Sequence, residues 1–510
     1  MKKHIIFLMI LAFIAAVITI IFVVSCNRHQ NVIRDNATEH KGNDLEDVEH
    51  SIRNEAINNV TKIYIDGKLL PTSENPDHPL EPFTANSSTY LWIQALAEAS
   101  GKEVEWDSLN QSIYIGTKPF DLNVSKIAII TNKAEDNMES YYSVQEVLGK
   151  YGSDKILHYL WPDAYYMSQF PDEIEKLLIQ IASEPSIKAL IINPDARGTV
   201  EALDKLLEIR DDMFIVLINP GNFELDIAPK ANLVLKQDDV AMGIPMARQA
   251  KKMGAQVFVH YSSPDHMYSD LACDRRELIK KECADLGMLF VDITAPHQWN
   301  DNSATGYQNF MRENFPLMVE KYGKDTAFFC NNCEMQTSLI ESVIESGAIY
   351  SQPCHPSPFH GFPMALGIIE REDSSKKGNW YEYSSDYGYS NYTDSLFRNA
   401  LYAEGSIKLN DVIAKIIKDK GMSGRVSNWP ILFSTLATQA AVDYAFMWIN
   451  GKVSRDEIDI EVFQQCLSEN AGVDCYTNPY VFDNRHYVEG MYENITLDNF
   501  LLIREDYITY

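Results

Sequence analysis

Five cysteine and histidine residues in the middle of the chain have the types and spacing of a metal site. Cys330 and Cys333 form a Cys-x-x-Cys pair, and Cys354, His355 and His360 follow in a short segment. Thiolates and imidazoles at these spacings can supply the four tetrahedral ligands of Zn²⁺. A single Cys-x-x-Cys pair is weak support, because a cysteine at the end of a buried strand is more often part of the core. We therefore predict no metal and no other cofactor, and a metal-dependent hydrolase that uses these five residues is the alternative function.

Other kinds of chemistry have even less support in the sequence. The chain contains no phosphate-binding loop, dinucleotide fingerprint, nucleophile elbow or His-Glu-x-x-His motif. It carries 44 Lys and Arg against 72 Asp and Glu, which gives a formal net charge of −28. A polyanion would be repelled by this charge, so nucleic acid is excluded as a partner. The sequence thus predicts a protein that is not an enzyme.

The N-terminus has the features of an export signal. Lys2 and Lys3 precede an uncharged apolar run, residues 5–24, which ends in Ser25-Cys26. This ending resembles the bacterial lipobox, in which the cysteine is acylated and becomes the first mature residue. An uncleaved membrane anchor is the alternative, since the run is long enough to span a bilayer. We expect residues 1–26 to be a lipoprotein signal peptide and the mature chain to lie on the extracytoplasmic face of the cell membrane, anchored by lipid at Cys26.

Seven cysteines remain once Cys26 is set aside, and they cannot all pair. A chain of this length does not need disulfides to fold, so buried thiols are the default expectation. Cys466 and Cys475, which are separated by a loop containing Gly472, are the best candidate pair for a local bridge, and the sequence leaves the connectivity open.

The chain before residue 125 divides into a linker and a small module. Residues 27–58 are acidic and poor in apolar positions, which predicts a flexible tether. Residues 59–118 combine strands, a helix from Tyr90 to Ala99 and a hairpin, as expected for an α+β module. The segments 64–67, 82–83, 95–98, 104–107 and 113–115 resemble the stalk module that is similar to the N-terminal domain of copper amine oxidases. The module has no copper ligand set, so the resemblance implies a spacer.

From Ser125 onward, apolar strands alternate with helices. Strands that are apolar on both faces and separated by helices predict parallel sheets covered on both sides. The pattern divides residues 125–510 into a first lobe at about 125–240, a second at about 255–365 and a C-terminal extension at about 366–510. The expected strands are 126–130, 155–160, 187–192, 213–218, 256–260, 288–293 and 326–330.

The succession of these elements resembles the type I periplasmic binding protein fold. Residues 239–257 are similar to the segment that crosses between its lobes, and residues 274–287 to the first helix of its second lobe. Residues 326–347 resemble the strand and helix where this fold places an Asn-Asp pair facing the ligand, although this chain has Asn331-Asn332-Cys333-Glu334 instead. The region from residue 125 is also similar to an uncharacterised bacterial lipoprotein family of unknown function. The resemblance implies a two-lobed α/β fold that binds a small solute for an importer or a sensor.

Candidate ligand contacts follow from a general rule for such sheets. Ligands bind beyond the carboxyl ends of parallel strands, where loops converge and helix N-termini present free N–H groups. Trp161 is the foremost candidate, because an aromatic face flanked by acids suits a sugar or a cationic amine. The same residue types are also ordinary turn and cap residues. The rule selects Asn132, Glu135, Tyr261, Ser262, Thr294, His297 and Asn331, which we leave outside the predicted set. Our predicted ligand-binding set is Asp136, Trp161, Asp163, Asn193, Asp195, His260, Asn332 and Glu334.

Overall fold

The computed structural model divides the chain into two compact units, Met1–Lys118 and Pro119–Tyr510. In the first unit it describes Gly101 and short strands between Tyr64 and Ile115. In the second it describes residues 124–162, 171–221, 224–264, 266–296, 304–368, 395–482 and 495–510. The predictions for the signal peptide, Cys26, the tether, the helix at 91–99 and Asp163 lie outside the described residues.

The described part of the first unit consists of antiparallel strand pairs. β1 (Tyr64–Ile65) pairs with β2 (Lys68–Leu69), and β3 (Phe83–Ala85) with β4 (Ser88–Tyr90). The predicted hairpin is present as β5 (Val104–Asp107) and β6 (Ser112–Ile115). Tyr90, which we expected to open a helix, is instead the last residue of β4.

Lobe 1 of the second unit is built on a seven-stranded sheet with the order β17-β18-β11-β10-β9-β7-β8. The neighbouring strands are parallel except at the edge, where β17 runs antiparallel to β18. The central strands are buried on both faces, because their apolar residues alternate between two helical layers. The strands are β7 (Lys126–Thr131), β8 (Ile156–Leu160), β9 (Ile187–Asn193), β10 (Phe214–Ile218), β11 (Leu233–Gln237), β17 (Cys475–Phe482) and β18 (Ile495–Glu505).

Helices cover both faces of this sheet. One face packs against α4 (Met138–Tyr151), α14 (Phe433–Ile449) and α15 (Ile460–Ala471), around Phe214, Tyr444 and Trp448. The other face packs against α5 (Pro171–Ala182) and α6 (Thr199–Ile209). Short helices, α7 (Glu224–Ile227) and η1 (Ala228–Lys230), join β10 to β11.

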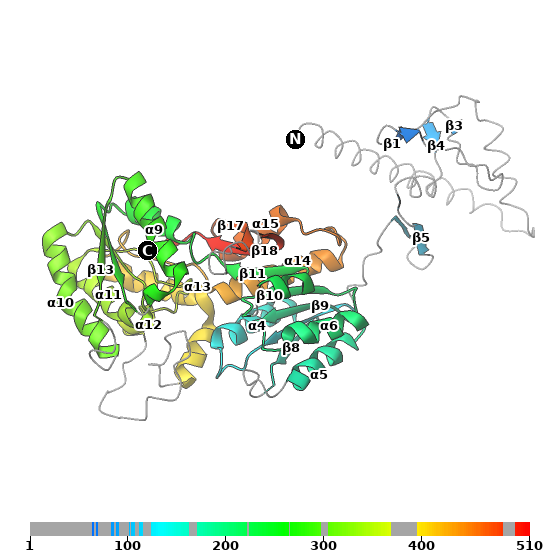
Figure 1. Cartoon of the computed structure of the whole chain (residues 1–510), viewed down its shortest axis with the longest axis horizontal. Coiled ribbons are helices and arrows are strands. Elements are labelled where there is room, and N and C mark those ends of the chain that lie inside the picture. Colours follow the sequence, from blue (N-terminus) through cyan, green and yellow to red (C-terminus); the bar gives the residue numbers. More distant parts are fainter. Residues whose placement is uncertain are drawn as a thin grey trace, which may run out of the picture. The chain divides into compact units, whose positions relative to one another are not determined.

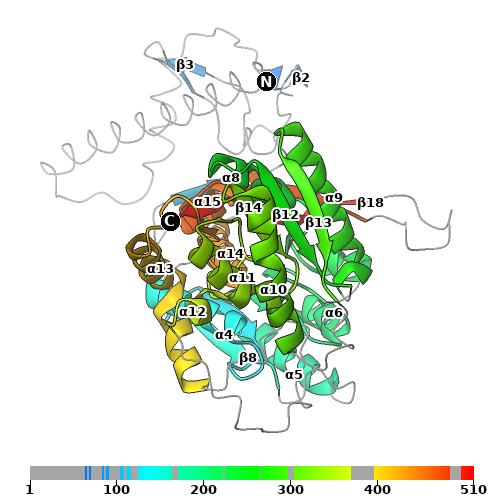
Figure 2. The same ribbon diagram turned by 90° about the vertical axis from the view of Figure 1, so that its left-hand side faces the viewer.

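Lobe 2 contains a parallel four-stranded sheet with the order β13-β12-β14-β15. One face is covered by α10, α11, α12 and α13, and the other by α8 and α9 (Figure 2). The elements are α8 (Gly243–Lys252), β12 (Val257–Ser262), η2 (His266–Tyr268), α9 (Asp270–Asp285), β13 (Leu289–Thr294), α10 (Ala304–Tyr322), β14 (Thr326–Cys330), α11 (Cys333–Ser346), β15 (Ile349–Tyr350), α12 (Phe362–Ala365) and α13 (Ser395–Asp419).

The C-terminal 140 residues are shared between the two lobes rather than added to their end. The second half of α13 packs in lobe 2, whereas α14, α15, β17 and β18 belong to lobe 1 (Figure 1). The chain then returns as β19 (Ile508–Thr509), which pairs with β16 (Ser427–Asn428). In the described residues the chain thus passes between the lobes at 238–243, 429–433 and 505–508. This architecture is the two-lobed α/β fold of the type I periplasmic binding protein kind, as the sequence predicted.

Cys466 and Cys475, the candidate pair for a local bridge, are both buried free thiols, which agrees with the default expectation of buried thiols. Cys466 lies on α15 and Cys475 begins β17, and each side chain is buried in the core of lobe 1. Burial raises the pKa of Cys466 to about 11, and it raises the pKa of Cys475 still further above its ordinary value. The two residues therefore act as small apolar side chains of the core.

Candidate functional site

Buried polar side chains gather at the carboxyl ends of the strands in both lobes. In lobe 1, Asn132 follows β7 and Asp195 follows β9, which itself ends at Asn193. In lobe 2, Asn332 follows β14 and Gln352 follows β15. Such a concentration is unusual for protein interiors, where amide and carboxyl groups are kept only if they are paired. The partners of each side chain therefore separate structural residues from candidates for ligand contact.

Asn132 and Gln352 are the two amides whose burial the described residues do not explain. Asn132 is 1% exposed and Gln352 is fully buried. In each, both the carboxamide nitrogen and the carboxamide oxygen lack a hydrogen-bond partner among the described residues. A buried polar group without a partner costs about 1–3 kcal/mol. Each lobe therefore has, beyond the carboxyl end of a strand, one buried amide whose nitrogen and oxygen have no partner among the described residues.

The other polar residues of lobe 1 are held by the fold. Asn193 donates through Nδ2 to Thr438 Oγ1 at 2.9 Å and to the Ser434 carbonyl oxygen at 3.4 Å, which ties β9 to α14. Asp195 accepts a hydrogen bond from the Gly221 backbone N–H at 2.6 Å. Asp136 lies in the exposed turn before α4. These contacts give Asn193 and Asp195 structural roles, and ligand binding by them stays a prediction.

Trp161 lies in the core of lobe 1. It is 2% exposed, packs with the apolar layer under α5 and α6, and donates its indole N–H to the Pro194 carbonyl oxygen at 2.9 Å. This bond brings Trp161, Asn193 and Asp195 to the same part of the strand edge. Its burial favours a packing role over stacking on a ligand.

Asn331 and Asn332 organise the strand edge of lobe 2. Asn331 accepts through Oδ1 from the Ser263 backbone N–H at 3.0 Å. Asn332 caps α11 by accepting from the Glu334 backbone N–H at 2.7 Å, and it donates to Ser263 Oγ at 3.3 Å. In place of the expected Asn-Asp pair, this segment therefore has an asparagine that caps a helix.

His260 lies further inside its strand than we predicted. It lies within β12, and its Nδ1 is 2.9 Å from Asp292 Oδ1. Burial lowers the pKa of His260, although the carboxylate of Asp292 opposes this shift. Arg276 also contacts Asp292, at 3.3 Å, so the histidine is one end of a chain of polar contacts on β12, β13 and α9.

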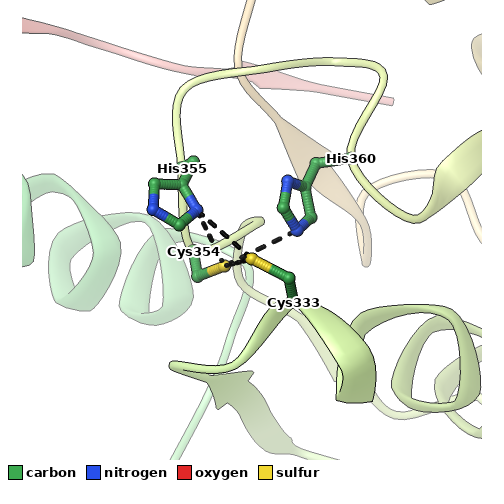
Figure 3. A group of neighbouring side chains, drawn as sticks. All are labelled: Cys333, Cys354, His355 and His360. Carbon is green, nitrogen blue, oxygen red and sulfur yellow. Dashed lines mark hydrogen bonds between the residues drawn. The ribbon is translucent and has the colours of Figure 1, made fainter. Parts of the chain in front are cut away.

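Four of the five cysteine and histidine residues meet at the strand edge of lobe 2 (Figure 3). Cys333 is the first residue of α11, and Cys354, His355 and His360 come from the loop after β15. Their ligand atoms all lie within 4.8 Å of one another. Cys354 Sγ is 3.7 Å from Cys333 Sγ, 3.3 Å from His355 Nδ1 and 3.7 Å from His360 Nε2. We call these four residues the Cys/His cluster.

The electrostatics of the Cys/His cluster favour a thiolate at Cys354. Burial alone would raise the pKa of Cys354, but the hydrogen bond with Cys333 and the positive charges of His355 and His360 hold it well below its usual range. The same hydrogen bond, together with burial, raises the pKa of Cys333 well above its usual range. Burial would lower the pKa of His355, and the charge of Cys354 raises it overall.

Cys330 is not part of the Cys/His cluster. Its thiol is buried on the opposite face of the sheet, in the layer under α10 and α11, and it contacts the Asn332 carbonyl oxygen at 3.6 Å. The five-residue set of our alternative function is therefore reduced to four, because successive side chains of a strand and its following turn point to different faces.

Neighbouring residues hold the loop of the Cys/His cluster in place. Arg275 donates to the Cys354 carbonyl oxygen at 3.2 Å, and Trp429 donates its indole N–H to the Pro353 carbonyl oxygen at 3.0 Å. Gly361 has φ = 79°, and a Cβ atom there would lie 2.9 Å from Gln336 Cβ. Glycine is required at this position, because the loop must turn tightly against α11 to present His360.

Residues 125–385, about half of the chain, match the family model described as "Protein of unknown function (DUF3798)". The chain belongs to this family. The matched region runs from β7 beyond β15 and contains Asn132, Gln352 and the Cys/His cluster. No helix among the described residues is long and apolar enough to cross a membrane.

Two uncharacterised proteins of Treponema pallidum (strain Nichols) are relatives of this DUF3798 chain. Each is 27% identical to it, one over 172 residues (34% of this chain and 80% of the relative) and the other over 176 residues (33% and 79%). Among solved structures, a putative transcriptional regulator from Clostridium difficile 630 has a TM-score of 0.62 at 21% identity, over 76% of this chain and 99% of that chain. A sugar ABC transporter structure from Actinomyces odontolyticus ATCC 17982 has a TM-score of 0.39 at 12% identity, over 66% and 86%. The first of these structures supports the fold alone.

Gln352 is the residue of the strand edge that the sequence analysis missed. β15 is only two residues long, Ile349–Tyr350, and so leaves almost no apolar run to recognise. The signal that could have found it is the regular spacing of lobe 2, in which a fourth strand is expected after α11.

Proposed function

We propose that this protein is a solute-binding protein, not an enzyme, which binds a small polar molecule at the carboxyl ends of its two parallel sheets. The observation that carries the proposal is the pair of buried amides, Asn132 in lobe 1 and Gln352 in lobe 2, which lack partners among the described residues. Open α/β sheets bind ligands at this edge. The two-lobed fold supports the proposal as well, because each lobe contributes one amide.

The chemistry of these amides indicates the class of solute. A carboxamide donates through its nitrogen and accepts through its oxygen, so it matches a hydroxyl or another amide. Sugars and nucleosides present several such groups on a compact framework. Acidic residues at the same edge, such as Asp195, are suited to hydroxyls or to an ammonium group. We therefore place sugars and nucleosides first, and amines and amino acids second.

We further propose that the protein is held by lipid at Cys26 on the extracytoplasmic face of the cell membrane, where it supplies an importer or a sensor. The basis is the sequence of residues 2–26, with its basic start, apolar run and Ser25-Cys26 ending. Replacing Cys26 with Ala should release the protein from membranes or leave it unprocessed. Unchanged mature mass and unchanged membrane retention would contradict the lipid anchor.

The alternative, a metal-dependent hydrolase, has less support. Catalytic zinc sites use three protein ligands and keep a position open for water, whereas sites with four protein ligands are structural. The Cys/His cluster provides four ligand atoms within 4.8 Å of one another, which leaves no position for a reacting water. The geometry therefore favours binding over catalysis.

A thermal-shift screen of the full chain against sugars, nucleosides, amines and amino acids tests the solute-binding proposal. A compound that binds only the folded state raises the melting temperature. For a compound found in this way, Gln352→Leu should weaken binding at least about tenfold, which corresponds to about 1.4 kcal/mol. Gln465→Leu, an amide on the exposed side of α15, is the matched control and should bind normally. Normal binding by Gln352→Leu and by Asn132→Leu would refute the site.

A further inference from the structure

We propose that Cys333, Cys354, His355 and His360 bind one transition-metal ion, with Zn²⁺ as the expected occupant. The metal would fasten the loop after β15 to the N-terminus of α11. This inference does not depend on the proposed solute. It rests on the arrangement of four side chains, which the fold brings together from two separate segments of lobe 2.

Four of the six distances between ligand atoms in the Cys/His cluster are close to those of a tetrahedron around zinc. With Zn–S bonds of about 2.3 Å and Zn–N bonds of about 2.0–2.1 Å, the edges of a regular tetrahedron are about 3.8 Å between sulfurs and about 3.5–3.6 Å between sulfur and nitrogen. Cys333 Sγ and Cys354 Sγ are 3.7 Å apart. The sulfur–nitrogen distances are 3.6 Å from Cys333 to His355, and 3.3 Å and 3.7 Å from Cys354 to His355 and His360.

The choice of ligand atoms agrees with this geometry. His355 presents Nδ1 and His360 presents Nε2, and each faces sulfur (Figure 3). A Cys₂His₂ set is typical of structural zinc sites, because thiolate and imidazole suit this borderline-soft cation. Within the described residues, no other group of three or more histidine, cysteine or acidic side chains has its ligand atoms as close together.

Hydrogen bonding alone does not account for the arrangement. A thiol is a weak donor and a weak acceptor, so gathering two thiols and two imidazoles out of water gains little. Cys283 and Cys466 show how this chain buries a cysteine outside the cluster, which is to pack it among apolar side chains. The Cys/His cluster differs from both, and a bound cation gives a physical reason for the difference.

The environment of the cluster indicates what the metal would do. Its loop carries Gln352 at one end, and the Phe433 backbone N–H at the start of α14 donates to the Pro356 carbonyl oxygen at 3.2 Å. α14 packs in lobe 1, so the loop lies where the chain passes from lobe 2 to lobe 1. Fixing Cys354 and His360 to α11 would therefore stabilise both the strand edge and this connection.

A Cys333–Cys354 disulfide is the main competing explanation. The two sulfurs are 3.7 Å apart, well beyond a disulfide bond of about 2.05 Å. Oxidation would remove both thiolates from the ligand set and so exclude the metal. The two explanations therefore predict opposite results for metal content and for free thiols.

The experiment uses the full chain, solubilised in detergent and purified without chelators. Elemental analysis should find about one zinc per chain. After removal of the metal under reducing conditions, titration with Co²⁺ should give the visible bands of a tetrahedral site and a thiolate-to-cobalt charge-transfer band. Zn²⁺ should then displace Co²⁺ with loss of colour, and it should raise the melting temperature of the metal-free protein.

Two variants and two controls complete the test. Cys333→Ser and His360→Ala should each weaken metal binding at least about a hundredfold, since the binding free energy of such sites is about 10–16 kcal/mol over four ligands. Cys330→Ala and Cys273→Ser remove cysteines outside the cluster and should keep both the stoichiometry and the cobalt spectrum. Circular dichroism checks that each variant is folded.

The outcomes that overturn the proposal are equally specific. Reduced, folded wild-type protein that gives no thiolate-to-cobalt band refutes it, and this result does not depend on any variant. A native Cys333–Cys354 disulfide found by mass spectrometry of the unreduced protein also refutes it. So does a Cys333→Ser protein that binds metal as tightly as the Cys330→Ala control.

Discussion

Replacing Asn132 with Leu should leave the ligand-free protein as stable as the natural chain or more stable, although the residue is almost fully buried. The amide has no partner among the described residues, so folding removes it from water without compensation. That penalty is about 1–3 kcal/mol, and a leucine of similar size would instead gain from burial. Strain from the different shape offsets part of the gain. We expect the free energy of unfolding to change by between 0 and about +2 kcal/mol.

Asn193→Leu is the matched control, because it is the same substitution at the end of a neighbouring strand. Asn193 pairs in register with Thr131, the residue before Asn132, and is equally buried. Its Nδ2 bonds to Thr438 and Ser434, so the substitution removes both hydrogen bonds and leaves the Ser434 carbonyl oxygen without this donor. We expect a loss of about 1–3 kcal/mol.

Equilibrium unfolding in urea, measured by circular dichroism on the full chain without added solute, provides the comparison. The urea midpoint of Asn193→Leu should be lower than that of the natural chain. The midpoint of Asn132→Leu should be unchanged or higher. With a solute from the screen, Asn132→Leu should also bind at least about tenfold more weakly. If Asn132→Leu lowers stability as much as Asn193→Leu, then its amide is structurally paired and the reasoning fails.

Three further substitutions test other buried groups. Trp161→Ala should lower the free energy of unfolding in urea by about 3–5 kcal/mol, because the ring fills the core of lobe 1. Unchanged stability would contradict this packing role and favour Trp161 as a ligand contact. Burial lowers the pKa of His158 from 6.5 to about 4, so the stability that it contributes is complete above pH 6.5 and is lost as the pH falls toward 4. His158→Gln should flatten this part of the stability–pH curve, and an identical curve would show that other groups cause the slope. Burial raises the pKa of Glu505 well above its usual range, so the stability of the protein falls as the pH rises above about 4.5. Calorimetry at pH 8 should therefore find Glu505→Gln more stable than the natural chain. A less stable variant would show that the carboxylate is paired.

The sequence by itself determined the two α/β lobes. Runs such as Ile127–Ile130 and Phe258–Val259 are apolar at every position, and strands of this kind are stable only between two helical layers. Helices lie between these strands, as the alternating pattern predicted, and α8 begins at Gly243. There the Asp238 side chain accepts from the Ala241 backbone N–H and forms a turn first. The strand-edge rule also selected Asn132, although the predicted ligand-binding set left it out.

The tertiary structure decided which of the selected residues are paired. Asn193 meets Thr438, which is 245 residues away in the sequence, and Trp161 meets the Pro194 carbonyl oxygen. Neither contact has a local pattern, because each depends on how α14 and the loop after β9 pack against the sheet. The Cys/His cluster shows the same limit. Spacing places Cys330 and Cys333 together, yet the turn from β14 into α11 sends Cys330 to one face of the sheet and Cys333 to the other. The spacing of residues can be read from the sequence. Hydrogen-bond pairing and ligand geometry cannot, because they depend on side-chain directions, which only the packed fold fixes.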